Sequence, residues 1–404
     1  MTPKRIPLAL RAAAHAAPAR SKVEQQQISI SVVPLADAAT IVVACRRGLF
    51  ERHGLDVTLS VEPSWASTRD KLVAGAVDAA HLLAPMAIAA TLGAGPLRTP
   101  IVTALSLGMN GNAITFSREL AAQLPERAGA AALGAALRER IAQRAQRGER
   151  RIRLASVFPY SMHSYLLRHW LAASRIDPDA DVDLRVVPPP RMVERLDSGA
   201  IDAFCVGEPW NTLAVQSGAG RILLSAREIW GLAPEKVLGV KLAWAERYPE
   251  THLAMLAALI ESAEFCDAPE NREEVARALS KTLGLSLEAL LASLAANESP
   301  GAHVFSRHAA GFPWRSQAAW IAAQMLRWGQ IEGPVDGKEV AERVYRTDWY
   351  RQAARRVGHD APSEDWKIEG AHAAAWAVRS EAGSIAMAPD HFFDGRAFDP
   401  FQPL

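Results

Sequence analysis

The chain contains 404 residues, of which 49% are hydrophobic and 22% are charged, a balance typical of a soluble globular protein. This length suggests two or three ordinary domains, or one architecture of two large lobes. The 45 Lys and Arg against 44 Asp and Glu leave a net charge of +1, which argues against nucleic acid as the main ligand. Cys45, Cys205 and Cys266 are too few and too scattered for a disulfide framework or a zinc cluster, so we expect buried thiols.

Residues 1–27 begin with a basic segment followed by small residues, as a secretion signal does. Arg11 and His15 interrupt the apolar part of this segment, and it contains no cysteine for lipid attachment. No stretch of the chain approaches the ~20 apolar residues that a membrane-spanning helix requires. We therefore expect a disordered tail at 1–27 and a cytoplasmic protein.

From residue 28, short β-rich runs alternate with helical ones, which favours an α/β class with parallel sheets. Strands are expected at 28–34, 56–63, 78–83, 101–107 and 112–117, and helices from residue 38, at 67–74 and at 85–93. A long helix rich in Ala and Arg is expected at 119–147, and its run of arginines indicates a solvent-exposed face.

A second α/β set follows, with expected strands at 151–157, 183–187 and 202–210 and a helix at 161–173. The segments 72–79 and 196–203 share five identical positions and one Val/Ile exchange. In both, we expect a helix to end at a Gly, with an Asp before the next strand. This repeat suggests two lobes built on one plan.

The remainder of the chain, from about residue 241, has mostly helical spacing. Helices are expected within 271–297, at 316–329 and up to about residue 357. The last forty residues lack periodicity, so we expect irregular structure there.

Catalytic signatures are missing from the sequence, which contains no nucleophile elbow, phosphate loop, H-E-x-x-H helix or C-x-x-C pair. We therefore expect neither an enzyme nor a bound cofactor. His81 and His163 would need a third ligand to hold a metal ion, and none is evident, so we expect no metal and a structural role for His81.

Polar and aromatic residues are found where several strands should end. They include Trp65 after VEPS, the Asn110–Asn112 turn, His163 at the first turn of a helix, and Glu208–Asn211. In open α/β sheets, ligands bind beyond the carboxyl ends of strands, where helix N-termini favour a small anion. These residues are also of the types that fill turns and pack cores, so their positions leave both interpretations open.

Five blocks resemble, in the same order, the nitrate- and bicarbonate-binding family of solute receptors. They are residues 31–93 from SVVPLADAAT to ATLG, then GMNGNAITFS, PYSMHSYLLRHW, GEPWN and FPWRSQAAWIAAQMLRWG. The resemblance covers residues 28–357 and implies an α/β, two-lobed fold of the periplasmic-binding-protein-like type II, with a helical C-terminal extension. It implies lobe I at 28–116 plus 241–404 and lobe II at 117–240.

The resemblance also implies which residues bind the ligand. They are Trp65, Asn112, His163, Pro209 and Lys236, with Lys241 as the alternative to Lys236. Nitrate only accepts hydrogen bonds, so we expect a pocket made of donors. Bicarbonate also carries a hydroxyl and would gain from a carboxylate. Lys236 therefore favours nitrate or nitrite.

The expected function is that of a cytoplasmic nitrate/nitrite sensor of nitrate assimilation. In the group it resembles, the receptor holds an RNA-binding antiterminator with an ANTAR domain and releases it when ligand binds, so the chain itself would contact neither nucleic acid nor membrane. The first alternative is the substrate-binding component of a nitrate or bicarbonate ABC importer. The second is a thiamine-pyrimidine synthase-like enzyme, which the isolated cysteines disfavour.

Overall fold

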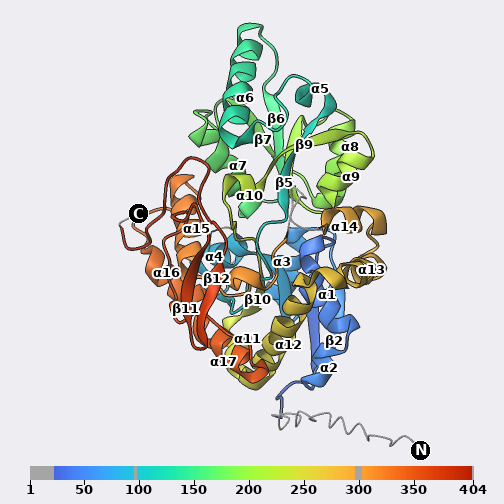
Figure 1. The fold of residues 1–404 in the computed structure, drawn as a ribbon, viewed down its shortest axis with the longest axis vertical. Helices are drawn as coiled ribbons and strands as arrows, with labels where there is room; N and C mark the ends of the chain where they lie inside the picture. Colours follow the sequence, from blue (N-terminus) through green and yellow to red (C-terminus); the bar gives the residue numbers. More distant parts are fainter. Residues whose placement is uncertain (1–21, 95–97, 296–302, 403–404) are drawn as a thin grey trace, which may run out of the picture.

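The computed structural model describes residues 22–94, 98–295 and 303–402. Two five-stranded sheets lie one above the other along the long axis of the molecule, each with helices packed against it (Figure 1). A separate two-stranded hairpin lies near the C-terminus. The expected two-lobed α/β architecture is confirmed.

The first sheet, in the lower half of Figure 1, has the strand order β2-β1-β3-β10-β4. Its strands are β1 (Gln27–Val32), β2 (Asp56–Val61), β3 (Ala79–Leu83), β4 (Ile101–Val102) and β10 (Lys236–Lys241). Its early helices are η1 (Ala36–Ala38), α1 (Ala39–Arg46), α2 (Leu49–Arg52), α3 (Trp65–Ala74) and α4 (Ala84–Leu92). Strands β1, β2 and β3 are parallel, whereas β10 runs antiparallel to both of its neighbours. A late segment of the chain therefore completes the sheet begun by the N-terminal part.

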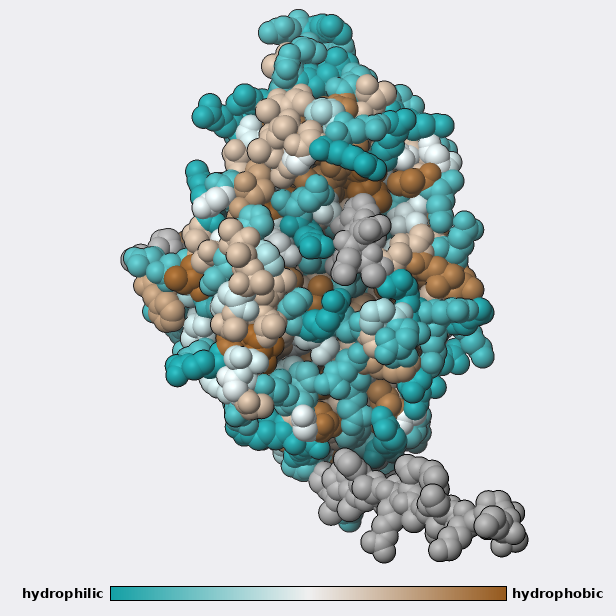
Figure 2. Space-filling view, viewed as in Figure 1, coloured by the Kyte–Doolittle hydropathy of each residue, from teal (hydrophilic) through white to brown (hydrophobic). Residues whose placement is uncertain are grey.

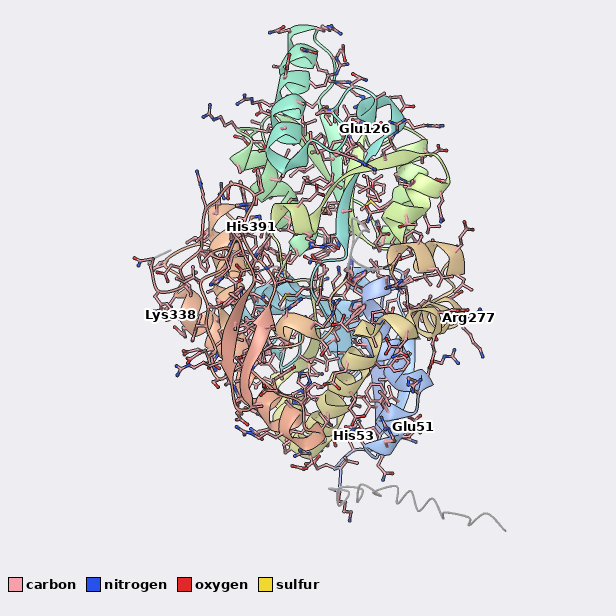
Figure 3. The ribbon with its side chains drawn as sticks, in the orientation of Figure 1. Glu51, His53, Glu126, Arg277, Lys338 and His391 are labelled. Atoms are coloured by element: carbon pink, nitrogen blue, oxygen red, sulfur yellow. The ribbon has the colours of Figure 1, made fainter. Side chains whose placement is uncertain are left out.

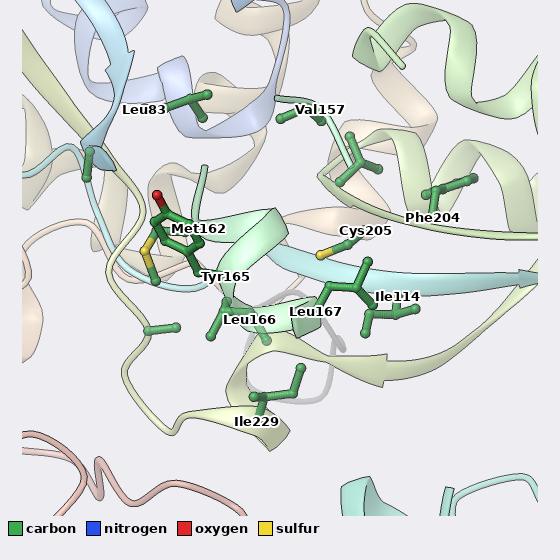
Figure 4. Packing of buried hydrophobic residues seen from close by; sticks show 14 of the residues in the cluster. Leu83, Ile114, Val157, Met162, Tyr165, Leu166, Leu167, Phe204, Cys205 and Ile229 are labelled. Atoms are coloured by element: carbon green, nitrogen blue, oxygen red, sulfur yellow. The ribbon is translucent and has the colours of Figure 1, made fainter. Parts of the chain in front are cut away.

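The second sheet has the order β7-β6-β8-β5-β9. Its strands are β5 (Asn112–Ser117), β6 (Ile152–Ser156), β7 (Val182–Val186), β8 (Ala203–Gly207) and β9 (Gly220–Ser225). The helices between them are α5 (Arg118–Ala121), α6 (Gly129–Gln146), α7 (Met162–Ala173), η2 (Pro189–Arg191), α8 (Met192–Asp197), α9 (Trp210–Gln216) and α10 (Ala226–Ile229). Tyr165 and Leu167 of α7 belong to the same buried cluster as Ile114 and Phe204 of the sheet (Figure 4).

The internal repeat has the same structure in both lobes. Gly75 and Gly199 each take a left-handed conformation at a helix end, with φ of 75° and 65°. Asp78 Oδ2 accepts a backbone N–H of β1 at 2.8 Å, and Asp202 Oδ2 accepts one of β6 at 2.7 Å. Each carboxylate thus joins the start of a strand to its neighbour, so the repeated sequence marks the same structural joint twice.

The C-terminal part is mostly helical, as expected. Its elements are α11 (Leu242–Arg247), α12 (Pro249–Asp267), η3 (Pro269–Asn271), α13 (Arg272–Leu283), α14 (Leu287–Ser293), η4 (Arg307–Ala309), α15 (Arg315–Arg327), α16 (Gly337–Val344) and α17 (Thr347–Val357). The expectation of irregular structure throughout the last forty residues is wrong, because β11 (Trp376–Ser380) and β12 (Gly383–Met387) form an antiparallel hairpin. Each strand has five residues and is only partly buried, so its hydrophobic alternation is weak.

The expected disordered tail at 1–27 is wrong for residues 22–27, the part of it that the structure describes. Residues 1–21 lie outside the described residues. Strand β1 already begins at Gln27, and the Glu24 carboxylate accepts the backbone N–H groups of Thr251 and Glu250 at 2.8 and 3.1 Å. Glu24 therefore satisfies free donors at the start of α12, where a carboxylate also favours the helix dipole.

Three expected boundaries also differ from the structure. Residues 112–116, expected in lobe I, form most of β5 in the second sheet, and 236–240, expected in lobe II, form most of β10 in the first. Strand pairing decides this membership, and local periodicity does not report it. The helix expected at 119–147 is divided into α5 and α6, with Pro125 between them, because proline has no N–H to continue a helix.

The surface is largely hydrophilic in the view of Figure 2, with scattered apolar patches. Charged side chains such as Glu51, Glu126 and Arg277 project outward from the ribbon (Figure 3). All three cysteines are free thiols; two are buried and Cys45 is partly buried. Across the described ranges, no helix combines the length and the apolar content that crossing a membrane requires.

Candidate functional site

Two crossover segments, 103–111 and 226–235, connect the sheets. Asn110 joins them: its backbone N–H donates to Ala233 O at 2.9 Å, its Oδ1 accepts the N–H of Ala233 at 3.0 Å, and its Nδ2 donates to Gly231 O at 3.2 Å. The residues that follow the crossovers begin β5 and β10. The first residues of these two strands therefore lie at the junction of the lobes.

At this junction lies a buried polar group, the Lys236 cluster, centred on an ammonium with no solvent exposure. Lys236 Nζ lies 2.7 Å from Asp37 Oδ2 and 2.5 Å from Glu235 Oε2. It also lies 3.4 Å from Asn112 Oδ1 and 3.4 Å from His163 Nε2. The Asn112 amide donates to the Glu235 carboxylate. One cation thus contacts groups from η1, β5, α7 and the crossover residue that directly precedes its own strand.

Trp65 completes the Lys236 cluster. Its ring centroid lies 5.9 Å from Lys236 Nζ and 5.2 Å from the His81 ring, which it meets edge-on. His81 Nδ1 accepts the backbone N–H of Val33 at 3.4 Å, which leaves the proton on Nε2, 3.0 Å from Asp37 Oδ1. His81 therefore holds Asp37 in place beside the lysine.

Helix capping explains how Trp65 and His163 reach this position. Trp65 is the first residue of α3, where Ser64 Oγ accepts the N–H of Ser67 at 3.2 Å. His163 is the second residue of α7, where Ser161 Oγ accepts the N–H of Ser164 at 3.0 Å. Serine caps satisfy free donors at helix starts, so both rings are fixed within a first turn, near the positive end of a helix dipole.

Three buried N–H donors of the cluster form no hydrogen bond among the described residues, but His81 Nε2 lies 3.0 Å from Asp37 Oδ1. The other two, Trp65 Nε1 and His163 Nδ1, have no such acceptor. His163 Nε2 faces the Lys236 ammonium and must accept, so the ring proton is on Nδ1. Unpaired buried donors are costly and uncommon in native proteins, so each needs an explanation. An acceptor ligand would provide one.

Burial and mutual charge set the ionisation of the cluster. Burial raises the pKa of Glu235 to about 7; Lys236 offsets part of this rise, and the negative charge of Asp37 adds to it. Burial opposes ionisation of Asp37 as well, but Lys236 and His81 hold its pKa well below the usual range. Burial disfavours the Lys236 cation, yet the two carboxylates raise its pKa. Burial and the Lys236 charge hold the pKa of His163 well below its usual value.

The structure brings four of the residues carried over from the family together: Trp65, Asn112, His163 and Lys236. Lys241 lies at the opposite end of β10, so the geometry favours Lys236. Pro209 follows a cis peptide bond just before α9. It lies two residues after Gly207, and Gly207 is close to the cluster, because a Cβ on it would be 3.3 Å from Asn112 Oδ1. Their roles in ligand binding stay predictions.

Sequence reasoning missed two members of the cluster, Asp37 and Glu235. The expectation of a pocket made only of donors is therefore wrong, because two buried carboxylates contact the lysine. Glu235 directly precedes the predicted lysine, and Asp37 follows an expected strand end, as other candidate residues do. Neither position by itself distinguishes a buried carboxylate from an ordinary surface one.

Two α/β sheets joined by two crossovers are the architecture of the periplasmic-binding type II fold, and the buried polar cluster lies at their junction. The family model described as the NMT1-like family matches residues 21–280. The crystal structure of the periplasmic nitrate-binding protein NrtA from Synechocystis PCC 6803 superposes with a TM-score of 0.80 at 28% identity, covering 94% of this chain and 97% of that one.

Curated relatives agree with this class. The nitrate/nitrite binding protein NrtA of Synechococcus elongatus is 31% identical, over 94% of this chain and 85% of that protein. The nitrate import ATP-binding protein NrtC of Synechocystis is 37% identical over 94% of this chain, and the bicarbonate transport ATP-binding protein CmpC of Synechococcus elongatus is 38% identical over 84%. The chain spans about half the length of these two ATP-binding proteins, 54% and 51%.

The chain belongs to the NMT1-like family, among the nitrate- and bicarbonate-binding solute receptors. Its relatives are named for binding and transport, in agreement with the expectation that it is not an enzyme.

Proposed function

We propose that this chain is a receptor that binds nitrate or nitrite in the Lys236 cluster. The observation that carries the proposal is a fully buried lysine beside two buried N–H donors, on Trp65 and His163, that have no partner among the described residues. A small planar anion offers acceptor oxygens to such donors. The relatives named as nitrate/nitrite binding proteins support the same ligand.

The position of the cluster supports a receptor that closes around its ligand. Trp65 belongs to the lobe of the first sheet and His163 to the lobe of the second. An anion that contacts both binds the closed arrangement of the lobes better than an open one, so it shifts the population toward closure. Ligand occupancy is thereby converted into a difference in shape that a partner protein can recognise.

Calorimetric titration of the dialysed protein with nitrate, nitrite and bicarbonate tests the proposal. We expect saturable binding of nitrate or nitrite at one site per chain. Tighter binding of bicarbonate than of either nitrogen anion would overturn the choice of ligand. Absence of binding by all three would overturn the receptor proposal.

Nitrate import is the process that we propose the receptor serves. Relatives named for nitrate import support this, although the chain spans only about half of their length. The second candidate is the cytoplasmic sensor that controls an ANTAR-type antiterminator, and the proposed ligand-dependent closure provides the signal that it requires. Affinity purification with and without nitrate distinguishes them: recovery of importer subunits supports the first, and nitrate-sensitive recovery of an ANTAR protein supports the second.

A further inference from the structure

We propose that the site takes up one proton together with a nitrate-type anion, and that Glu235 is the residue that receives this proton. The inference rests on the proposed function and specifies how the choice of anion depends on pH. Two carboxylates, rather than one, contact the single cation of the site.

The Lys236 cluster contains two carboxyl side chains beside a single lysine. Asp37 Oδ2 and Glu235 Oε2 lie 2.7 and 2.5 Å from the same Lys236 ammonium, and all three side chains are buried. If both carboxylates are ionised, they outnumber the cation, and His163 adds no charge because burial and Lys236 keep its pKa well below the usual value. A monoanion entering this environment would add a third negative charge beside one positive charge, in a setting where water screens little. Protonation of one carboxylate removes the excess.

The other titratable groups around Glu235 do not change their charge near neutral pH. Asp37 is held ionised by Lys236 and His81, and its pKa lies well below the usual range. His303, beyond Asp37, has its pKa lowered to about 4 by burial. Burial raises the pKa of the Cys205 thiol on β8, and the two carboxylates raise that of Lys236, so both keep their protons at neutral pH.

Glu235 is the member of the cluster whose charge changes near neutral pH, since burial raises its pKa to about 7. Its carboxylate accepts from the Asn112 amide through Oε1, while Oε2 faces Lys236. A proton on Oε2 would turn this oxygen into a donor toward an anion and leave the Lys236 ammonium available to the same anion. The carboxylate that repels nitrate would thus become part of its donor set.

The proton state of Glu235 also separates two classes of ligand. Nitrate and nitrite have no proton to donate, so they require the protonated acid. Bicarbonate adds the same negative charge, but its hydroxyl can donate a hydrogen bond to the ionised carboxylate, so we expect its affinity to depend less on the proton of Glu235. Glu235 is therefore a specificity-determining residue whose preference changes with pH.

Titration calorimetry of the full chain between pH 6 and 9 tests the inference. In wild type, we expect the nitrate Kd to rise by roughly tenfold per pH unit above pH 7, since each unit above the pKa reduces the protonated fraction tenfold. Repeating the titration in buffers of different ionisation enthalpy should show that close to one proton is taken up per nitrate near pH 8. This proton count needs no variant.

Two variants, Glu235→Gln and Glu208→Gln, provide the comparison. Glu235→Gln should make the nitrate Kd nearly independent of pH and, at pH 9, lower than that of wild type. Glu208→Gln is the matched control, because burial raises the pKa of Glu208 to about 7 too, while its carboxylate accepts the backbone N–H of Thr212 at 3.1 Å. This control should retain the pH dependence of wild type.

The outcomes separate this inference from the function on which it rests. Nitrate binding with a constant Kd and no proton uptake would overturn the inference and leave the receptor function standing. Loss of the pH dependence in Glu208→Gln instead of Glu235→Gln would assign the proton to Glu208 and would also overturn the inference. No nitrate binding at any pH would overturn the proposed function, and this inference with it.

Discussion

Lys236 and Lys241 begin and end the same strand, but only Lys236 contacts the candidate ligand residues. Removal of a charged donor to a buried anion typically costs about 1.5–3 kcal/mol, or roughly ten- to over a hundred-fold in affinity. We expect this loss of nitrate affinity in Lys236→Ala, measured by calorimetry. Lys241→Ala is the control and should bind as wild type does; the reverse result would place the ligand lysine at 241.

The donors around the lysine should differ in how much each contributes. His163 presents a buried N–H without a partner, whereas the Asn112 amide already donates to Glu235. We expect His163→Ala to weaken nitrate binding by roughly tenfold or more, and Asn112→Ala to weaken it less, because a water molecule can replace an amide. Calorimetry of both variants at pH 6.5 measures the difference. A larger loss in Asn112→Ala would contradict this order.

Glu208 should make the stability of the protein depend on pH. Burial raises its pKa to about 7 in the folded state, against about 4.3 in an unfolded chain. A raised pKa contributes stability that is complete below the unfolded value and is lost as pH rises through the folded value. We therefore expect Glu208→Gln to gain stability relative to wild type between pH 4.5 and 7, by on the order of 2–3 kcal/mol, in denaturant titrations at several pH values. A constant difference across this range would contradict the prediction.

At the scale of elements, α6 and α7 make their close approach at Gly134. A Cβ added there would lie 2.6 Å from the Cβ of Ser174, at the end of α7. Alanine normally favours a helix over glycine by about 1 kcal/mol, but overpacking costs about 1–3 kcal/mol. We expect Gly134→Ala to lower the free energy of unfolding by about 1–2 kcal/mol, measured in urea. Adding Ser174→Gly should restore most of the loss, and failure to do so would show that the helix contact is not its cause.

At the scale of the whole molecule, the two crossovers meet at Asn110, whose side chain bonds to both Gly231 and Ala233. If nitrate contacts both lobes, its binding should favour the closed arrangement. We expect the radius of gyration from small-angle scattering to fall when saturating nitrate is added, and amide exchange in 103–111 and 226–235 to slow. Lys236→Ala should show neither change at the same nitrate concentration. Equal scattering profiles of wild type with and without nitrate would argue against closure.

The sequence by itself determined the local elements and the plan of the two lobes. Periodicity and helix ends are local properties, so most strands and helices were predicted within a few residues. The repeat around Gly75 and Gly199 indicated the same joint in both lobes. The family blocks nominated Trp65, Asn112 and His163 because the order of motifs along the chain can be compared without a structure.

Only the tertiary structure decided what surrounds Lys236. Asp37 lies about 200 positions earlier in the chain, and its 2.7 Å contact depends on the antiparallel insertion of β10 beside β3. No local pattern encodes that pairing, and the hairpin at 376–387 was missed because its short strands are only partly buried. The ionisation of Glu235 is likewise a property of its surroundings, since burial and neighbouring charges shift a pKa and the residue type does not. Whether the carboxylate repels an anion or helps to bind one therefore depends on packing between distant segments.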